Sequence, residues 1–346
     1  MDVHVLNGNG FGGVESLFFH VLTNHNELNI KLIFLGGVPN QFTTNGLRKY
    51  LIFKKDIKKY RRKIRVLIPH ADYKSSIWLL YCRLILGIKV MPVSHGVIRH
   101  GTKNHFISFG LLVIKLALNK LVFKNKIAIS KMSGLDYFLG DFKVISYTPE
   151  NKKFVPKKGE PVNRPIRICC VGRFHSSWKI VSAKNQEFVF KVLQKLDERK
   201  VKYEMLFIGE GEDYNSLFSK YPVNGLIKRI SHTNNDIRFI HNSDLLLAPS
   251  LHESFGQAIL WSQLVGTKAL VSRNVCDEVN IGGCVYLGLK DENLIDWCEE
   301  IEYASRNLID TDYESPKIEK HLIYKNYLSK IKDEADCYYS QNFRSN

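Results

Sequence analysis

Short apolar runs alternate with longer stretches of helical periodicity along the whole chain. A run such as Leu245–Ala248 is apolar throughout, which is typical of strands that helices cover on both faces of a parallel sheet. The alternation occurs in both halves of the sequence and therefore predicts an α/β fold of two doubly wound domains. The runs that we expect to be strands are Val3–Leu6, Lys31–Leu35, Arg65–Pro69, Lys89–Val93, Lys126–Ile129, Val144–Ser146, Ile166–Val171, Tyr203–Ile208, Leu245–Ala248, Ala269–Ser272 and Cys284–Leu287.

A polar stretch punctuated by prolines, from Asn151 to Pro165, separates the two halves. A chain of 346 residues also agrees with two domains. We expect one domain over residues 1–160, a second over residues 161–325, and a helix at about 325–346 that packs back on the first. Open α/β sheets bind ligands at the carboxyl ends of their strands. The two domains are therefore expected to face a central cleft, and the residues that follow strands are the candidates for a site.

The positive charge lies almost entirely in the first half. Residues 1–164 carry 27 Lys and Arg against 9 Asp and Glu, a net +18, whereas residues 165–346 carry 23 against 25, a net −2. Residues 48–65 hold ten of these cations and one acid, Asp56, and their apolar positions fall near one helical stripe. This pattern predicts a basic amphipathic helix at an anionic membrane surface, with a solvated helix face as the alternative. Nucleic acid is not expected, because no helix-turn-helix, RNA-recognition or zinc-finger spacing accompanies the charge.

Cysteine usage and the apolar segments indicate the compartment. The seven cysteines are odd in number and form no Cys-x-x-Cys pair, which argues against a disulfide framework and a zinc site. The first residues show no basic region followed by an apolar stretch, so no signal peptide is expected. Polar residues interrupt the apolar segment from Phe106 to Phe123, which we interpret as a buried helix or a helix against lipid. We therefore expect a cytoplasmic protein, peripheral on the inner face of the cell membrane.

Two candidate positions follow strands in the first half. A glycine-rich segment containing Gly12 and Gly13 precedes an apolar helix, where backbone N–H groups can approach an anion closely. Its spacing is not the dinucleotide fingerprint. His95 lies just past the fourth strand and could donate to a sugar hydroxyl or phosphate, or act as an acid or base near neutral pH. A structural role is the alternative for His95, and His70 has the same placement with a weaker claim.

The second half offers cations and a carboxylate after its strands. Gly172 and Arg173 follow one strand and Lys184 opens the next helix, so that Arg and Lys can neutralise a diphosphate leaving group. Gly209 ends a further strand. After Leu245–Ala248 the chain reads Pro-Ser-Leu-His-Glu-Ser-Phe-Gly-Gln, a turn followed by a carboxylate and a glycine loop that opens a helix. Such a carboxylate can bind sugar hydroxyls while the helix N–H groups hold phosphate.

The order and spacing of Gly-Arg-Phe with Lys-Asn, Gly-Glu-Gly and Pro-Ser-Leu-His-Glu-Ser-Phe-Gly resemble the retaining glycosyltransferases of family 4, which have the GT-B fold. The Gly-Gly-Val-Glu, Ser-His-Gly and Ala-Ile-Ser-Lys stretches are similar to signatures of that family's N-terminal domain. Residues 271–279 resemble a bacterial subgroup that builds capsule, exopolysaccharide and O-antigen chains. The resemblance covers nearly the whole chain. It implies two Rossmann-like domains and transfer of a hexosyl group, with retention, from a nucleotide diphosphate sugar to a growing glycan linked to polyprenyl diphosphate.

The resemblance also implies roles for individual residues. Arg173 and Lys184 match the cations that bind the donor diphosphate, Glu253 matches the first glutamate of an E-x7-E motif that contacts the donor sugar, and His95 matches a histidine near the transferred sugar. No metal or other cofactor is expected, because the cations and helix N-termini supply the charge that supports the departing diphosphate. The positions that match donor-binding residues are Gly12, Gly13, Gly172, Gly209, Ser254, Phe255, Gly256, Gln257 and Trp261.

Two departures from the family pattern leave alternatives open. Trp261 stands where the second glutamate of the motif would fall, so its ring either packs on the nucleotide or lies in the core while another group holds the ribose. Ten residues separate Arg173 from Lys184, about twice the family's usual number, which makes Lys179 a rival for the lysine role. A GT-B binding or partner protein without catalysis is one alternative function, suggested by Trp261. A GT-B sugar-nucleotide epimerase is the other, disfavoured by the basic half.

Overall fold

The chain forms two compact units in its computed structural model, one made of Met1–Glu150 with Glu319–Asn346 and the other of Asn151–Ile318. The chain passes from the first unit to the second after Glu150, about ten residues before the boundary expected at residue 160, and it returns to the first unit at Glu319. No helix in the described part of the chain is both long and apolar enough to cross a membrane. The structure describes residues 1–6, 13–25, 29–43, 46–70, 76–95, 123, 125–138, 140–147, 149, 153–174, 184–231, 233, 236–310 and 319–341.

The first unit contains two parallel sheets. The larger has the order β2-β1-β3-β4 and the smaller the order β5-β6-β7. Every residue of β1 is buried, as expected for a central strand with both faces covered. The strands are β1 (Asp2–Leu6), β2 (Ile30–Phe34), β3 (Val66–Pro69), β4 (Lys89–Val90), β5 (Val93–Ser94), β6 (Ile127–Ala128) and β7 (Lys143–Val144).

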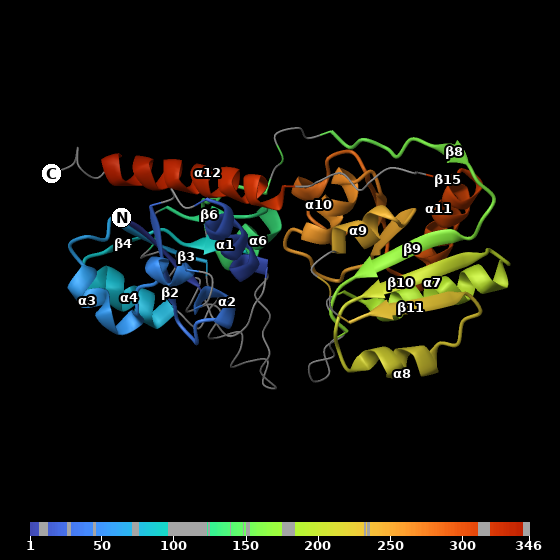
Figure 1. Ribbon diagram of the computed structural model, residues 1–346, viewed down its shortest axis with the longest axis horizontal. Coiled ribbons are helices and arrows are strands. Elements are labelled where there is room, and N and C mark those ends of the chain that lie inside the picture. The colour runs from blue at the N-terminus through green and yellow to red at the C-terminus, as the bar shows by residue number, and fades with distance from the viewer. Residues whose placement is uncertain are drawn as a thin grey trace. The chain divides into compact units, whose positions relative to one another are not determined.

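The C-terminal helix completes this unit. It packs along α1, and ion pairs of Arg65 with Asp336 and of Lys143 with Glu334 join it to the ends of two strands. Figure 1 shows this helix as the long red ribbon over the blue and green elements of the first unit. The α-helices of the unit are α1 (Gly13–Asn24), α2 (Asn40–Thr43), α3 (Ile57–Tyr60), α4 (Ser76–Leu84), α6 (Lys131–Tyr137) and α12 (Lys320–Gln341).

The basic segment from 48 to 65 is not the single amphipathic helix that the sequence predicts. It consists of the short 3-10 helices η1 (Leu47–Tyr50) and η2 (Lys54–Asp56), the four residues of α3, and a turn. The helical pattern breaks because the backbone at Leu51 is extended and bridges Leu32 of β2, and Ile52 donates to the Leu32 carbonyl at 2.8 Å. Apart from Phe53, the apolar side chains of the segment are buried or partly buried, and nearly all of the cations stay exposed.

The second unit is built on a six-stranded parallel sheet with the order β11-β10-β9-β12-β13-β14. Counted along the chain this is the order 3-2-1-4-5-6, the doubly wound arrangement of dinucleotide-binding domains. The direction of winding reverses between β9 and β12, which lie side by side. The strands are β9 (Ile166–Val171), β10 (Tyr203–Ile208), β11 (Leu226–Ile230), β12 (Leu245–Ala248), β13 (Lys268–Ser272) and β14 (Cys284–Leu287).

Helices cover both faces of this sheet, with α9 and α10 on one side and α8 on the other in Figure 1. A hydrophobic core joins α7 and α11 to the central strands, with Phe190, Phe207 and Trp297 fully buried. The helices are α7 (Gln186–Glu198), α8 (Asp213–Lys220), α9 (Asp236–His241), α10 (Gln257–Leu264) and α11 (Leu294–Arg306), with 3-10 turns η4 (Asp277–Val279) and η5 (Asp291–Asn293) and a short ladder of β8 (Glu160–Pro161) and β15 (Ile309–Asp310).

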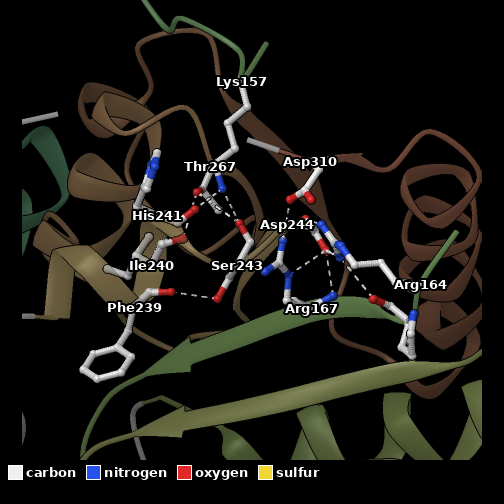
Figure 2. Close-up of polar contacts among 11 residues, drawn as sticks. Lys157, Arg164, Arg167, Phe239, Ile240, His241, Ser243, Asp244, Thr267 and Asp310 are labelled. Atoms are coloured by element: carbon white, nitrogen blue, oxygen red, sulfur yellow. Dashed lines mark hydrogen bonds and ion pairs between the residues drawn. The ribbon is translucent and has the colours of Figure 1, made fainter. Parts of the chain in front are cut away.

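Hydrogen bonds and ion pairs connect residues at the edge of the second sheet where its strands begin (Figure 2). Asp244 precedes β12 and accepts two hydrogen bonds from Arg164, at 2.7 and 2.8 Å, and one from the Arg167 backbone N–H at 2.7 Å. Lys157 donates its ammonium to the carbonyls of His241 and Ser243, and burial lowers the pKa of this lysine to about 8. Most of these polar groups therefore have protein partners, although the Nε atoms of Arg164 and Arg167 are buried without a hydrogen bond.

Candidate functional site

The carboxyl ends of β9 and β12 form the point where the winding of the second sheet reverses. In doubly wound sheets the crevice at this point is the usual ligand site. The segment after β9 contains Gly172 and Arg173, and Lys184 lies just before α7; the segment after β12 contains Glu253. The predicted second-half site residues therefore meet at one edge of one sheet.

Lys184 and Glu253 form an ion pair across this switch point. Their side chains are 32% and 13% exposed, so the pair is open to solvent on one side. Ser250 also donates to the same carboxylate oxygen, at 3.5 Å. The pair borders a small pocket, whose other lining residues come from the ends of β9 and β12 and from the start of α10. An ammonium has three donors and a carboxylate about four acceptor positions, so each partner can still bind a ligand group.

The loop from Ser250 to Gln257 has a fixed backbone. Gly256, just before α10, has a φ of +89°, and a Cβ atom there would lie 2.8 Å from Ile259. Phe255 is buried at 2% exposure and anchors the loop, while Ser254 and Gln257 are partly exposed. The loop therefore holds Glu253 and the first N–H groups of α10 in constant positions.

The loops after β9 and β10 touch through their backbones. A Cβ atom on Gly209 would lie 2.0 Å from the Gly172 carbonyl oxygen, so this approach requires glycine at 209. Gln186 donates to the carbonyls of Gly172 and Arg173, at 3.3 and 2.9 Å, which fixes the turn that carries Arg173. The Arg173 side chain itself is exposed. Gly172, Gly209 and Arg173 are thus neighbours, as the sequence analysis expected of residues at strand ends.

Trp261 lies in the core. Its side chain is 2% exposed, on the buried face of α10 beside Ile259 and Leu260. Of the two alternatives for this residue, core packing describes its position, and stacking of the exposed ring on a nucleotide does not. The structure thus gives no support to Trp261 as a donor-binding residue.

His95 belongs to a chain of three hydrogen-bonded histidines in the first unit. His4 Nδ1 lies 2.8 Å from His70 Nε2, and His70 Nδ1 lies 2.7 Å from His95 Nε2. The hydroxyls of Tyr147 and Tyr327 lie 3.0 and 3.1 Å from the two ring nitrogens of His95. This chain joins β1, the ends of β3 and β5, the segment after β7 and α12.

Burial keeps these imidazoles neutral. It lowers the pKa of His4 to about 4, that of His95 to about 3, and that of His70 well below its usual value. A neutral imidazole has one donor and one acceptor, and both nitrogens of His95 already have protein partners. This environment favours a structural role for His95 over that of an acid or base near neutral pH. Its partly exposed ring is a structural hub, the alternative that its sequence position left open.

Several predicted positions lie outside the described residues. Gly12 and Lys179 are among them, as is most of the segment from 106 to 123, and Gly13 is the first residue of α1. Of the two candidate lysines, the structure describes only Lys184, which forms an ion pair with Glu253, so the choice between Lys184 and Lys179 stays a prediction.

Sequence reasoning missed two groups of residues. His4 and Tyr327 were not singled out, although histidine inside an apolar strand and tyrosine on the inner face of a helix both require polar partners. Arg229, which donates hydrogen bonds to the carbonyls of Gly209 and Gly211, was missed because Leu226–Ile230 was not recognised as a strand.

Metal ligands are not gathered in the described part of the chain, where no group of three or more His, Cys, Asp or Glu could hold an ion. The sequence contains one Asp-x-Asp spacing, at Asp310 and Asp312. Asp310 lies 4.0 Å from Arg167, near the amino edge of the sheet (Figure 2), and Asp312 lies outside the described residues. The carboxylate at the switch point is Glu253, not this pair.

Comparisons with known proteins agree with this geometry. Residues 151–278 match the family described as "Glycosyl transferases group 1". HepE from Anabaena in complex with UDP is similar in structure, with 12% identity, 98% of this chain and 99% of that chain covered, and a TM-score of 0.69. The lipopolysaccharide outer core galactosyltransferase WaaB has 13% identity, coverage of 95% and 99%, and a TM-score of 0.64.

WaaG, a glycosyltransferase involved in lipopolysaccharide biosynthesis, has 13% identity, coverage of 94% and 94%, and a TM-score of 0.56. No curated protein matches the sequence. At such identities the likeness shows the fold, and it confirms the predicted α/β fold with parallel sheets. Residues 151–278 are therefore similar to glycosyl transferases group 1, in a chain with the fold of GT-B glycosyltransferases.

Proposed function

We propose that this protein transfers a hexosyl group from a nucleotide diphosphate sugar to a glycan, with retention of anomeric configuration. The observation that carries the proposal is the Lys184–Glu253 pair at the switch point of a doubly wound sheet, inside the segment that matches glycosyl transferases group 1. HepE has been crystallised with UDP and with UDP-glucose, which makes a nucleotide sugar the natural ligand to test here.

The chemistry follows from the charges at this edge. The bond between the anomeric carbon and the diphosphate breaks, and the diphosphate leaves with the electron pair. An acceptor hydroxyl oxygen bonds to the same face of the anomeric carbon, and its proton passes to the departing diphosphate oxygen. Lys184 and the exposed Arg173 stabilise the negative charge that develops on the leaving group, while the Glu253 carboxylate accepts hydrogen bonds from sugar hydroxyls. The ion pair with Glu253 also holds the Lys184 ammonium in place before the donor binds, which reduces the entropy lost on binding.

Turnover of a panel of nucleotide sugars tests the proposal. We expect release of nucleoside diphosphate to depend on a glycan acceptor, and Glu253→Gln to remove most of it. Interconversion of nucleotide sugars without an acceptor would instead indicate the epimerase. Binding of a nucleotide sugar without turnover for any acceptor would indicate the binding protein without catalysis.

We further propose that the acceptor is a glycan linked to polyprenyl diphosphate, and that the protein acts as a peripheral protein at the inner face of the cell membrane. The support is the cluster of exposed cations between 48 and 63, beside Phe53, whose apolar side chain is 50% exposed. A surface pocket lined by Phe34 at the end of β2, by the segment that follows this strand and by residues 51–53 opens next to Lys54 and Lys55. Each cation near an anionic surface contributes about 1 kcal/mol to binding.

Flotation with anionic liposomes tests the membrane contact. We expect reversal of six cations in the basic segment to abolish flotation and to leave turnover of a soluble acceptor unchanged. Reversal of six exposed cations in the second unit is the matched control and should float like the unmodified protein. Equal flotation of both variants would show an ordinary solvated surface. The test set is Lys54, Lys55, Lys58, Lys59, Arg61 and Arg62, and the control set is Lys200, Lys202, Lys220, Lys228, Lys290 and Arg306.

A further inference from the structure

The loop after β10 has three consecutive carbonyl groups that all accept hydrogen bonds from the protein. Arg229, on β11, donates its Nε to the Gly209 carbonyl at 3.3 Å and its Nη2 to the Gly211 carbonyl at 3.0 Å. The Phe174 backbone N–H donates to the Glu210 carbonyl at 2.7 Å. The carbonyl side of this loop is therefore turned into the protein.

This arrangement of the loop requires glycine at both positions. Gly209 and Gly211 have φ values of +156° and +141°. A Cβ atom on Gly211 would lie 1.7 Å from the Phe174 carbonyl oxygen, just as one on Gly209 would strike Gly172. The loop is thus pressed against the segment that carries Arg173, and its conformation depends on glycine and on Arg229 together.

The guanidinium of Arg229 is itself held by aromatic rings. Its carbon lies 4.6 Å from the ring centroid of Tyr214 and 5.5 Å from that of Phe174. Stacking on these rings while donating to two carbonyls uses the planar geometry of the group, which lysine cannot reproduce. Arg229 is therefore committed to the loop, whereas Arg173 remains exposed.

The opposite side of the loop presents donors. In a trans peptide the N–H points away from the preceding C=O, so the N–H groups of Glu210, Gly211 and Glu212 turn away from their bound carbonyls. In the part of the chain that the structure describes, none of these three N–H groups donates to a backbone carbonyl. The side chains of Glu210 and Glu212 are exposed beside them.

This combination fits an uncharged ligand group better than a phosphate. Two carboxylates repel a diphosphate, but they accept hydrogen bonds from hydroxyls such as those of a ribose. The backbone donors suit an exocyclic carbonyl oxygen, which uracil, thymine and guanine carry and adenine lacks. The diphosphate is left to Lys184 and Arg173 at the end of β9.

We propose that Arg229 is a positioning residue that shapes the loop 209–212 to bind the nucleoside part of the donor, with preference for a base that carries an exocyclic carbonyl. This inference rests on the proposed function, because it assumes that a nucleotide sugar binds at the switch point. Arg229 acts through the loop and does not touch the ligand.

Calorimetric binding of UDP, ADP and inorganic pyrophosphate to Arg229→Met tests the inference. We expect the Kd for UDP to rise about tenfold or more, since two charge-assisted hydrogen bonds that hold the loop are lost. The Kd for pyrophosphate should stay within about twofold of the unmodified protein, and the preference for UDP over ADP should largely disappear. In turnover, KM for the donor should rise with little change in kcat.

Controls separate this role from general destabilisation. Lys228→Met alters the neighbouring exposed residue of β11 and should change none of these values. Arg229→Lys keeps the charge but replaces the planar guanidinium by a single ammonium nitrogen, and it should give an intermediate Kd for UDP. It serves as the test variant if the methionine variant does not fold. Arg173→Ala should show the reverse pattern, with pyrophosphate binding weakened.

Two results would overturn the inference and one would overturn its foundation. Equal weakening of UDP and pyrophosphate, or an unchanged ratio of UDP to ADP binding, would show that Arg229 does not shape a nucleoside site. An unmodified protein that binds no nucleotide at all would contradict the proposed function itself.

Discussion

Both units place polar side chains directly after strands of parallel sheets, but the chemical use of these side chains differs between the units. In the second unit, Lys184 and Glu253 pair and both remain partly exposed. In the first unit, the His70 imidazole lies between those of His4 and His95 and is hydrogen-bonded to both. A lysine and a carboxylate keep spare donors and acceptors after they pair, whereas a neutral imidazole with two partners has none. Position after a strand brings groups together, and their chemistry decides whether a ligand can still use them.

Replacement of the buried Trp261 by a charged residue should cause the largest effect of the three predictions, a loss of stability in the second unit. We expect Trp261→Glu to lower the free energy of unfolding by about 4 kcal/mol or more, because a carboxylate would replace a ring that is 2% exposed. Thermal unfolding of the purified variant measures this loss. Trp261→Phe is the control and should lose far less, while a melting temperature near that of the unmodified protein for the glutamate variant would mean that the ring is not core.

Removal of Lys184 from the partly exposed pair with Glu253 tests whether the second unit uses this pair to bind the donor. Lys184→Ala should lower kcat/KM roughly 30- to 1000-fold, since a charge that stabilises the leaving group is lost. This corresponds to a loss of about 2–4 kcal/mol of transition-state stabilisation. Steady-state kinetics with the preferred donor measures the effect, and Arg173→Ala should behave similarly. Lys179→Ala is the matched control. If Lys179→Ala is inactive and Lys184→Ala is normal, the lysine of the site has been assigned wrongly.

A fall in pH should destabilise the first unit more than the second, and this is the smallest of the three expected effects. The histidine pKa values in the first unit are lower in the folded than in the unfolded state, so the unfolded state binds more protons and stability falls as the pH drops from 6.5 toward 4. His4 alone should remove roughly 2 kcal/mol at pH 5. Hydrogen exchange, corrected for its intrinsic pH dependence, should show β1 and α1 losing protection before β9 and β10.

The corresponding variant sharpens this test. His4→Phe places an uncharged ring beside Phe18, where His4 now lies at a centroid distance of 4.9 Å. It should reduce the difference in protection between pH 7 and pH 5 in the first unit. Loss of protection in both units together would show that the histidine chain is not the acid-sensitive element.

The strands that are apolar throughout could be predicted from the sequence, and those whose pattern depends on tertiary contacts could not. Leu245–Ala248 is a strand as predicted. A short run that is apolar throughout is typical of a strand whose two faces are both covered by helices. Leu226–Ile230 was missed because it is a partly exposed edge strand that contains Lys228 and Arg229. The basic segment had helical spacing, but hydrogen bonding of residues 51–52 to β2 overrides that pattern.

The candidate site shows the same division. The sequence placed Arg173, Lys184 and Glu253 after neighbouring strands, and the doubly wound order brings Lys184 and Glu253 into contact. It did not reveal that His95 is saturated, because its partners His70, Tyr147 and Tyr327 come from three distant segments. Hydrogen bonds over such separations leave no local pattern in a sequence.

The return of the chain at Glu319 has a consequence for biosynthesis. A ribosome finishes the whole of Asn151–Ile318 before it makes α12, so the unit that starts first is completed last. Until α12 emerges, α1 lacks the helix that packs along it and His95 lacks the Tyr327 hydroxyl. Domains usually fold in the order of their synthesis. In this protein the second unit can close while the first still exposes apolar surface to chaperones and proteases.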